Sequence, residues 1–214
     1  MARPVFVIGM QRNGTSVLAR LVQAARGVSR QYHPCPRWDI PLLAELGSDL
    51  EFKQTAWLRG MQIYLARRPE AWALAKLALP VMAESFAWPL LAKRWPEAAF
   101  VFALRDPLDA QASWRDGLPY LAAYEAQSRV SPEAYFEWSA AQRDLIEKFA
   151  AARPGRSAVV CYEELVLSPK PTMAPVWRLL GTEAPKGFET WIRKPKHWNL
   201  PRPGGSRSSV PALP

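Results

Sequence analysis

The chain has 214 residues, of which 49% are hydrophobic, and a formal net charge of +9. Its length and composition suit one α/β domain with a large core, and its two cysteines, Cys35 and Cys161, are too few for a disulfide framework and lack metal-ligand spacing. No signal-peptide pattern opens the chain, and the apolar stretch over residues 77–92 is too short to span a bilayer, so the sequence predicts a cytoplasmic protein without a transmembrane segment.

The positive charge favours an anionic partner, and nucleic acid is one alternative. The basic residues are scattered along the chain, however, and form no helix-turn-helix, RRM or zinc-finger pattern. The densest basic cluster, over residues 186–207, is expected to be a solvated surface. We therefore expect no nucleic-acid partner and keep a basic, non-enzymatic nucleic-acid-binding protein as the alternative. Nothing in the sequence predicts an oligomeric state.

Hydrophobic patterning predicts strands and helices in alternation. An apolar run over residues 4–8 predicts a buried strand, which a glycine loop joins to a helix from residue 16. The further predicted elements are a short strand over 28–32, helices over 40–50 and 55–67, a strand or helix over 71–79, a helix over 84–94, a strand over 98–104, a helix from 107, a long helix over 132–152 and a strand over 157–161. This order predicts a three-layer α/β fold, with a parallel sheet between two layers of helices.

One domain is predicted over residues 1–214. Its tail over residues 195–214 is rich in Pro, Gly and Ser, and it is expected to be a loop that is flexible from about residue 203.

The loop over residues 9–16, Gly-Met-Gln-Arg-Asn-Gly-Thr-Ser, has the glycine spacing of a phosphate-binding loop. A helix N-terminus offers unpaired N–H groups, so the backbone of Gly14 to Ser16 is expected to bind an anion, with Arg12 adding a full charge. Nucleoside-triphosphate loops carry a lysine where Thr15 stands, which favours a phosphate or sulfate bound here without a metal. A tight turn with a Thr15 or Ser16 helix cap is the structural alternative.

A second anion-binding pattern follows the strand predicted over residues 98–104. Arg105 comes directly after that strand, at the edge where ligands of open α/β sheets bind. Ser113 lies two helical turns later on the same face, and an arginine fork with a hydroxyl can clamp a phosphate. The structural alternative is an ion pair between Arg105 and Asp106 that caps the helix.

Together these segments resemble the bacterial-type sulfotransferases that use 3'-phosphoadenosine-5'-phosphosulfate (PAPS) and have a P-loop-NTPase-like fold. The first loop is similar to the family's 5'-phosphosulfate loop, and the segment from Arg105 to Ser113 is similar to its 3'-phosphate motif. Tyr162 resembles a tyrosine near the adenine, and the stretch from Arg202 to Gly205 resembles a late loop that closes over the 3'-phosphate. The resemblance implies cofactor binding by Gln11, Arg12, Asn13, Gly14, Thr15, Ser16, Arg105, Ser113, Tyr162, Arg202, Gly204 and Gly205.

The catalytic base is harder to transfer from the family. Its small-molecule branch uses the histidine of a Lys-Thr-His-Leu-Pro segment, but the stretch from Lys76 to Pro80 has Ala78 in that place. Other branches use a glutamate shortly after the first helix, and the same count lands near His33. The ordinary pKa of histidine, near 6.5, suits a general base, so His33 is the predicted base, with Asp39 and Glu45 as alternatives.

The resemblance implies transfer of a sulfuryl group from PAPS to a hydroxyl or amine, with release of adenosine 3',5'-bisphosphate and no metal. The acceptor is expected to be a glycan, a lipid-linked sugar or a small molecule. Arg12 is expected to stabilise the developing charge, and Lys76 to assist it. A P-loop nucleotide kinase or phosphotransferase is the alternative enzyme, and it would need ATP and Mg²⁺.

Overall fold

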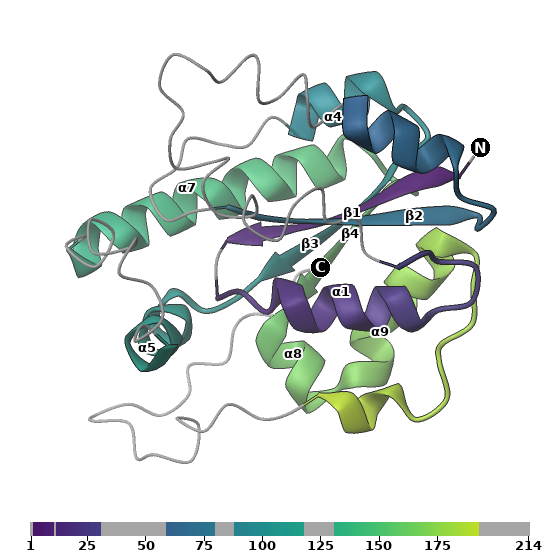
Figure 1. The fold of residues 1–214 in the computed structure, drawn as a ribbon. Coiled ribbons are helices and arrows are strands. Elements are labelled where there is room, and N and C mark those ends of the chain that lie inside the picture. The colour runs from purple at the N-terminus through teal and green to yellow at the C-terminus, as the bar shows by residue number, and fades with distance from the viewer. Residues whose placement is uncertain (1, 11, 31–58, 80–87, 118–130, 193–214) are drawn as a thin grey trace.

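The computed structural model describes residues 2–10, 12–30, 59–79, 88–117 and 131–192 (Figure 1). Its centre is a parallel sheet of four strands in the order β2-β1-β3-β4. The strands are β1 (Arg3–Met10), β2 (Trp72–Leu79), β3 (Ala99–Leu104) and β4 (Ser157–Cys161). Because all four run in the same direction, their carboxyl ends form one edge of the sheet, where β1 ends at Met10 and β3 at Leu104.

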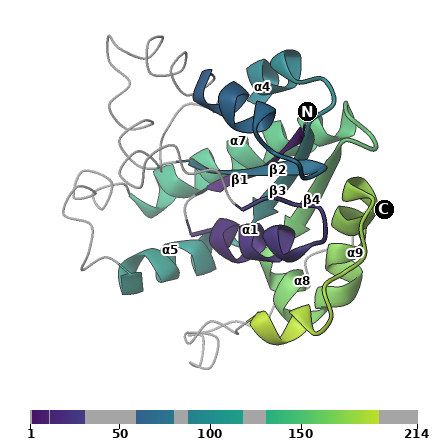
Figure 2. The same ribbon diagram turned by 45° about the vertical axis from the view of Figure 1, so that its right-hand side comes forward.

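Helices cover both faces of this sheet (Figures 1 and 2). One face carries α1 (Thr15–Ala24), α8 (Tyr162–Leu167), α9 (Pro169–Leu180) and the 3-10 helix η3 (Phe188–Trp191). The other carries a helix over residues 59–66, α4 (Trp88–Arg94) and α7 (Pro132–Ala151), whereas α5 (Pro107–Gly117) lies beyond the carboxyl edge in both views. The predicted three-layer α/β fold is confirmed.

Strand β1 lies between two apolar cores because its side chains point alternately to the two faces. Val5 and Val7 pack with residues of α1 and α9, whereas Phe6 and Ile8 pack with α4, α7 and the helix over 59–66. All four side chains are fully buried. A strand buried on both faces reads as a continuous apolar run, which is why residues 4–8 could be recognised as a strand.

Several predicted elements are confirmed within the described residues. These are the strands over 98–104 and 157–161, the helices from 107 and over 132–152, and the described parts of the helices over 55–67 and 84–94. Residues 55–58 and 84–87 of the last two lie outside the described part of the chain. The stretch over 71–79 is a strand, because it pairs with β1 along its whole length. The helix predicted over 40–50 and the tail over 195–214 lie outside the described residues.

The strand predicted over residues 28–32 is wrong for residues 28–30. Val28 makes a single parallel bridge to Trp72, and residues 29 and 30 continue no strand. The reason lies in Ser29, whose side-chain Oγ accepts the N–H of Leu74 at 3.2 Å. In a strand that continued here, a backbone carbonyl oxygen would accept this N–H. The Ser29 side chain accepts it instead, so the backbone pairing stops. Residues 31 and 32 lie outside the described part of the chain.

Candidate active site at the carboxyl edge of the sheet

The loop between β1 and α1 presents the helix N-terminus as the sequence predicts. A turn closes between the Asn13 N–H and the Met10 carbonyl at 3.1 Å, and Arg12 has a left-handed φ of 67°. Gly14 is the N-cap of α1, with a φ of 85° and no side chain to bond the first-turn N–H groups. The N–H groups of the first turn therefore lie at the carboxyl edge and receive no side-chain hydrogen bond from Gly14. N–H groups at a helix N-terminus in this situation can bind an anion. The alternative of a Thr15 or Ser16 cap is wrong, because both residues lie inside the helix.

Close packing holds this loop on its neighbours. A Cβ at Gly9 would lie 2.6 Å from the carbonyl oxygen of Ala103 in β3. A Cβ at Gly14 would collide with the ring of Tyr162. Asn13 is 1% exposed, and its Nδ2 donates to the Ala103 carbonyl at 3.4 Å. The loop therefore packs against β3 and against Tyr162.

Arg105 leaves β3 at the same edge and is 5% exposed. Its Nη1 donates to the Arg12 carbonyl at 2.8 Å, and its guanidinium carbon lies 4.6 Å from the ring centroid of Tyr162. The Glu163 carboxylate lies 3.9 Å from its Nε. Burial is the largest influence on Arg105 and lowers its pKa, against the raising effect of nearby Tyr162, Glu163 and Asp109. Arg105 is thus an enclosed cation at the expected edge.

The structural alternative, an Arg105–Asp106 ion pair that caps the helix, is half right. Asp106 does cap α5, because its Oδ1 accepts the N–H groups of Leu108 at 2.8 Å and Asp109 at 3.2 Å. Arg105 instead forms an ion pair with the carboxylate of Glu163, on α8. Glu163 was missed as a site residue, although it lies only two residues after the end of strand β4.

Hydrogen bonds join the two predicted anion-binding segments. Arg12 donates from Nε and Nη2 to the Ser113 Oγ at 3.2 and 3.0 Å, across 101 residues of sequence. Lys76, on β2, donates from Nζ to the Ser16 Oγ at 3.3 Å. Arg12, Lys76 and Arg105 therefore bring three cationic side chains to the N-terminal end of α1.

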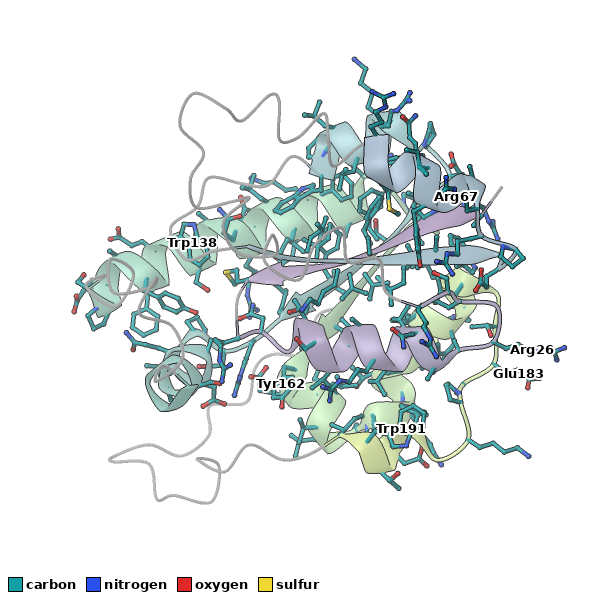
Figure 3. The ribbon with its side chains drawn as sticks, viewed as in Figure 1. Arg26, Arg67, Trp138, Tyr162, Glu183 and Trp191 are labelled. Atoms are coloured by element: carbon teal, nitrogen blue, oxygen red, sulfur yellow. The ribbon has the colours of Figure 1, made fainter. Side chains whose placement is uncertain are left out.

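Tyr162 opens α8 directly after β4 and lies next to the N-terminal end of α1 (Figure 3). Its ring lies next to Gly14, in the loop between β1 and α1, and next to the Arg105 guanidinium. Burial is the largest influence on the Tyr162 hydroxyl and raises its pKa, so the ring is neutral at physiological pH. An enclosed aromatic ring at this position offers a surface to a planar ligand group.

The charges of this site also act on a buried tyrosine of α7. Tyr135 is 4% exposed, and its hydroxyl is among the buried polar atoms of the described residues that have no hydrogen-bond partner. Burial raises the pKa of Tyr135 to about 12, while the charges of Arg105 and Asp106 act in opposite directions on it. Tyr135 was not predicted as a site residue, because in sequence it reads as one apolar position of a long helix.

The remaining predicted site residues lie outside the described part of the chain. They are Gln11, His33, Arg202, Gly204 and Gly205, together with the alternative bases Asp39 and Glu45. Their roles stay predictions. Over the described ranges, no group of three or more His, Cys, Asp and Glu side chains could hold a metal ion, and no helix there is long and apolar enough to cross a membrane.

The fold is that of solved sulfotransferases. A sulfotransferase from Alicyclobacillus acidocaldarius aligns with a TM-score of 0.56 at 19% identity, over 86% of this chain and 83% of that one. One from Mycobacterium avium aligns with a TM-score of 0.53 at 18% identity, over 89% and 67% of the two chains. A mouse sulfotransferase complexed with PAP aligns with a TM-score of 0.51 at 16% identity, over 89% of this chain and 63% of that one.

The sequence itself gives the family. The profile described as "Sulfotransferase family" matches residues 62–186, which is more than half of the chain. The chain therefore belongs to the sulfotransferase family. The matched stretch contains Lys76, Arg105, Ser113 and Tyr162 and begins after the loop over residues 9–16. Among curated proteins, no sequence matches the chain significantly.

Proposed function

We propose that this sulfotransferase transfers the sulfuryl group of PAPS to a hydroxyl or amine acceptor and releases adenosine 3',5'-bisphosphate. The observation that carries the proposal is the hydrogen bonding between the two anion-binding segments, in which Arg12 contacts both Ser113 and Arg105. A donor with phosphate groups at both its 5' and 3' positions needs two such segments at one edge. The PAP-bound mouse relative is consistent with this donor.

The loop before α1 suits the 5'-phosphosulfate end. Its first-turn N–H groups have no side-chain cap from Gly14, and Arg12 and Lys76 add two positive charges beside them. In phosphoryl and sulfuryl transfer the protein contributes mainly positioning and charge stabilisation. Arg12, Lys76 and the hydroxyls of Thr15 and Ser16 would stabilise the charge that develops on the leaving phosphate.

Arg105 and Ser113 suit the 3'-phosphate. A guanidinium binds a phosphate through paired hydrogen bonds, and the enclosed position of Arg105 strengthens its field. The Ser113 hydroxyl accepts from Arg12 and still has a proton to donate to a phosphate oxygen. ATP carries only a hydroxyl at its 3' position, so these two residues would discriminate between the nucleotides.

The transfer step needs a base for the acceptor. Bound PAPS supplies the activated sulfuryl group, whose S–O bond to the 5'-phosphate breaks as the acceptor oxygen or nitrogen bonds to sulfur. His33 would take the proton that the acceptor loses, and Asp39 and Glu45 are the alternatives. No metal takes part in the proposed step, because the positive charge comes from Arg12, Lys76 and the helix N-terminus.

The proposed acceptor is a glycan, a lipid-linked sugar or a small molecule. The departure at Ala78 from the histidine of the small-molecule branch favours the sugar classes.

Arg105→Ala tests the donor assignment. We expect its affinity for adenosine 3',5'-bisphosphate to fall about 10- to 100-fold, because a hydrogen bond to a charged group contributes roughly 1.5–3 kcal/mol. Its affinity for ATP should change much less. Arg20→Ala, which removes an exposed arginine of α1, is the matched control and should bind both nucleotides as the native chain does. An equal loss of affinity for both nucleotides in Arg105→Ala would contradict the assignment.

A further inference from the structure

Glu163 places a carboxylate directly on the turn that carries Arg105. Its Oε1 accepts the Asp106 N–H at 3.1 Å and lies 3.9 Å from the Arg105 Nε. The Glu163 side chain is 25% exposed, so most of it has lost contact with water. An acidic side chain therefore contacts the same guanidinium that is proposed to bind the 3'-phosphate.

The surroundings of Glu163 do not favour its negative charge. Burial is the largest influence and raises the pKa of Glu163 above its ordinary range, and Asp109 on α5 raises it further. The hydrogen bonds of backbone N–H groups and the charge of Arg105 act in the opposite direction and lower it. Tyr162 and Cys161, the two residues before it in sequence, also interact with this carboxylate, and both are neutral at physiological pH. Glu164, the next residue of α8, is an exposed carboxylate. Arg105 is therefore the positive charge that favours its ionisation.

An anion that binds to Arg105 changes this balance. It takes up part of the guanidinium's hydrogen-bonding capacity, and it brings a second negative charge close to the Glu163 carboxylate. Two like charges on one cation repel each other, and the repulsion is relieved if one of them takes up a proton.

We propose that Glu163 is an internal counter-anion of Arg105, and that binding of a phosphate or sulfate group at Arg105 is coupled to proton uptake by the Glu163 carboxylate. Glu163 is thus a positioning residue, because it acts on the ligand through Arg105. In the enzyme, this coupling makes the bound anion easier to release as the pH rises. The inference rests on the proposed function only for the identity of the anion as the 3'-phosphate of the donor.

Two substitutions at neighbouring glutamates separate charge from structure. Glu163→Gln keeps an oxygen that can accept the Asp106 N–H but removes the charge. Glu164→Gln makes the same change one residue further along, at an exposed position. Calorimetric titrations of each protein in two buffers of different ionisation enthalpy count the protons taken up per anion bound. Adenosine 3',5'-bisphosphate is one probe, and sulfate, which stays a dianion across the range where carboxylates titrate, is the other.

We expect the native chain and Glu164→Gln to take up protons on binding either anion, and Glu163→Gln to take up fewer. Above the pKa of Glu163, the Glu163→Gln protein should bind both anions about three- to tenfold more tightly, which corresponds to roughly half to one pKa unit of coupling. The phosphates of the bisphosphate can take up protons as well, but they do so with both proteins. The difference in proton uptake between the two proteins therefore excludes this contribution. Equal proton uptake in the native chain and Glu163→Gln would overturn the inference, as would weaker binding by the variant.

The outcomes also separate this inference from the proposed function. If the native chain binds sulfate with proton uptake that Glu163→Gln lacks, but does not bind the bisphosphate, the inference stands and the donor assignment fails. If neither anion binds, both fail. If Glu163→Gln does not fold, an NMR titration of the Glu163 carboxyl in the native chain with and without sulfate decides, because the inference requires its pKa to rise when sulfate is present.

Discussion

At the scale of single residues, the site depends on how Arg105 is enclosed. It is the one buried arginine among the described residues, and a buried charge is tolerated only where other groups compensate it. The Arg12 carbonyl, the Tyr162 ring and the Glu163 carboxylate each contact one part of the guanidinium. These contacts fix its direction at the carboxyl edge, which is what a residue that binds one particular phosphate needs.

The substitution Tyr135→Phe tests whether the buried Tyr135 hydroxyl lacks a hydrogen-bond partner. We expect Tyr135→Phe to leave the free energy of unfolding unchanged or to raise it by up to about 1 kcal/mol, because no hydrogen bond is lost. Urea denaturation measures this difference. A loss of more than about 1 kcal/mol would mean that the hydroxyl has a partner after all.

The same pair of proteins should differ in alkaline solution. The pKa of Tyr135 is raised to about 12 in the folded chain, against about 10 for an unfolded tyrosine. Its contribution to stability is therefore fully present below about pH 10 and is lost as the pH rises toward 12. Tyr135→Phe should lose less stability over that range than the native chain does. Identical losses in the two proteins would contradict a raised pKa for Tyr135.

At the scale of elements, the loop between β1 and α1 depends on Gly14. Its φ of 85° lies in the left-handed region, and a Cβ there would also collide with Tyr162. We expect Gly14→Ala to reduce the free energy of unfolding by about 1–3 kcal/mol and to weaken binding of the bisphosphate. Thermal or urea unfolding and calorimetry measure the two effects.

Gly155 provides the matched control for that substitution. It has a φ of 72°, but a Cβ added there would meet nothing within 4 Å. Gly155→Ala should therefore carry the backbone cost alone and leave anion binding unchanged. If the two alanine variants bind the bisphosphate equally well, the contact between Gly14 and Tyr162 does not shape the site.

Elements were predictable where one pattern dominated. Strands β1, β3 and β4 are apolar runs, and α7 begins at a proline and a serine N-cap. Strand β2 was ambiguous, because the Ala and Leu residues of Trp72–Leu79 also favour helices and only pairing with β1 decides its form. Helices α8 and α9 were missed, since α8 is short and α9 contains prolines that break the usual helical pattern.

The site was predictable in part for a similar reason. The position directly after a strand identified Arg105, because the carboxyl ends of parallel strands meet at one edge, whereas Tyr162 was expected only from the family resemblance. The Arg12–Ser113 and Arg105–Glu163 contacts join residues far apart in sequence, so they depend on how the elements pack. No local pattern carries that information.

At the scale of the whole molecule, the net charge of +9 attracts anions in general, whereas the site selects one kind. General attraction falls steeply with salt, because it comes from exposed charges that counterions screen. Binding at Arg105 comes from an enclosed cation with fixed neighbours, so it should persist at higher ionic strength. Selectivity between nucleotides therefore separates the site from the overall charge.

The most direct test of the account is calorimetry of the native chain with adenosine 3',5'-bisphosphate and with ATP, each with and without Mg²⁺. We predict tight binding of the bisphosphate that does not depend on Mg²⁺, and much weaker binding of ATP. Binding of ATP that requires Mg²⁺, with no preference for the bisphosphate, would contradict the assignment of the site to PAPS.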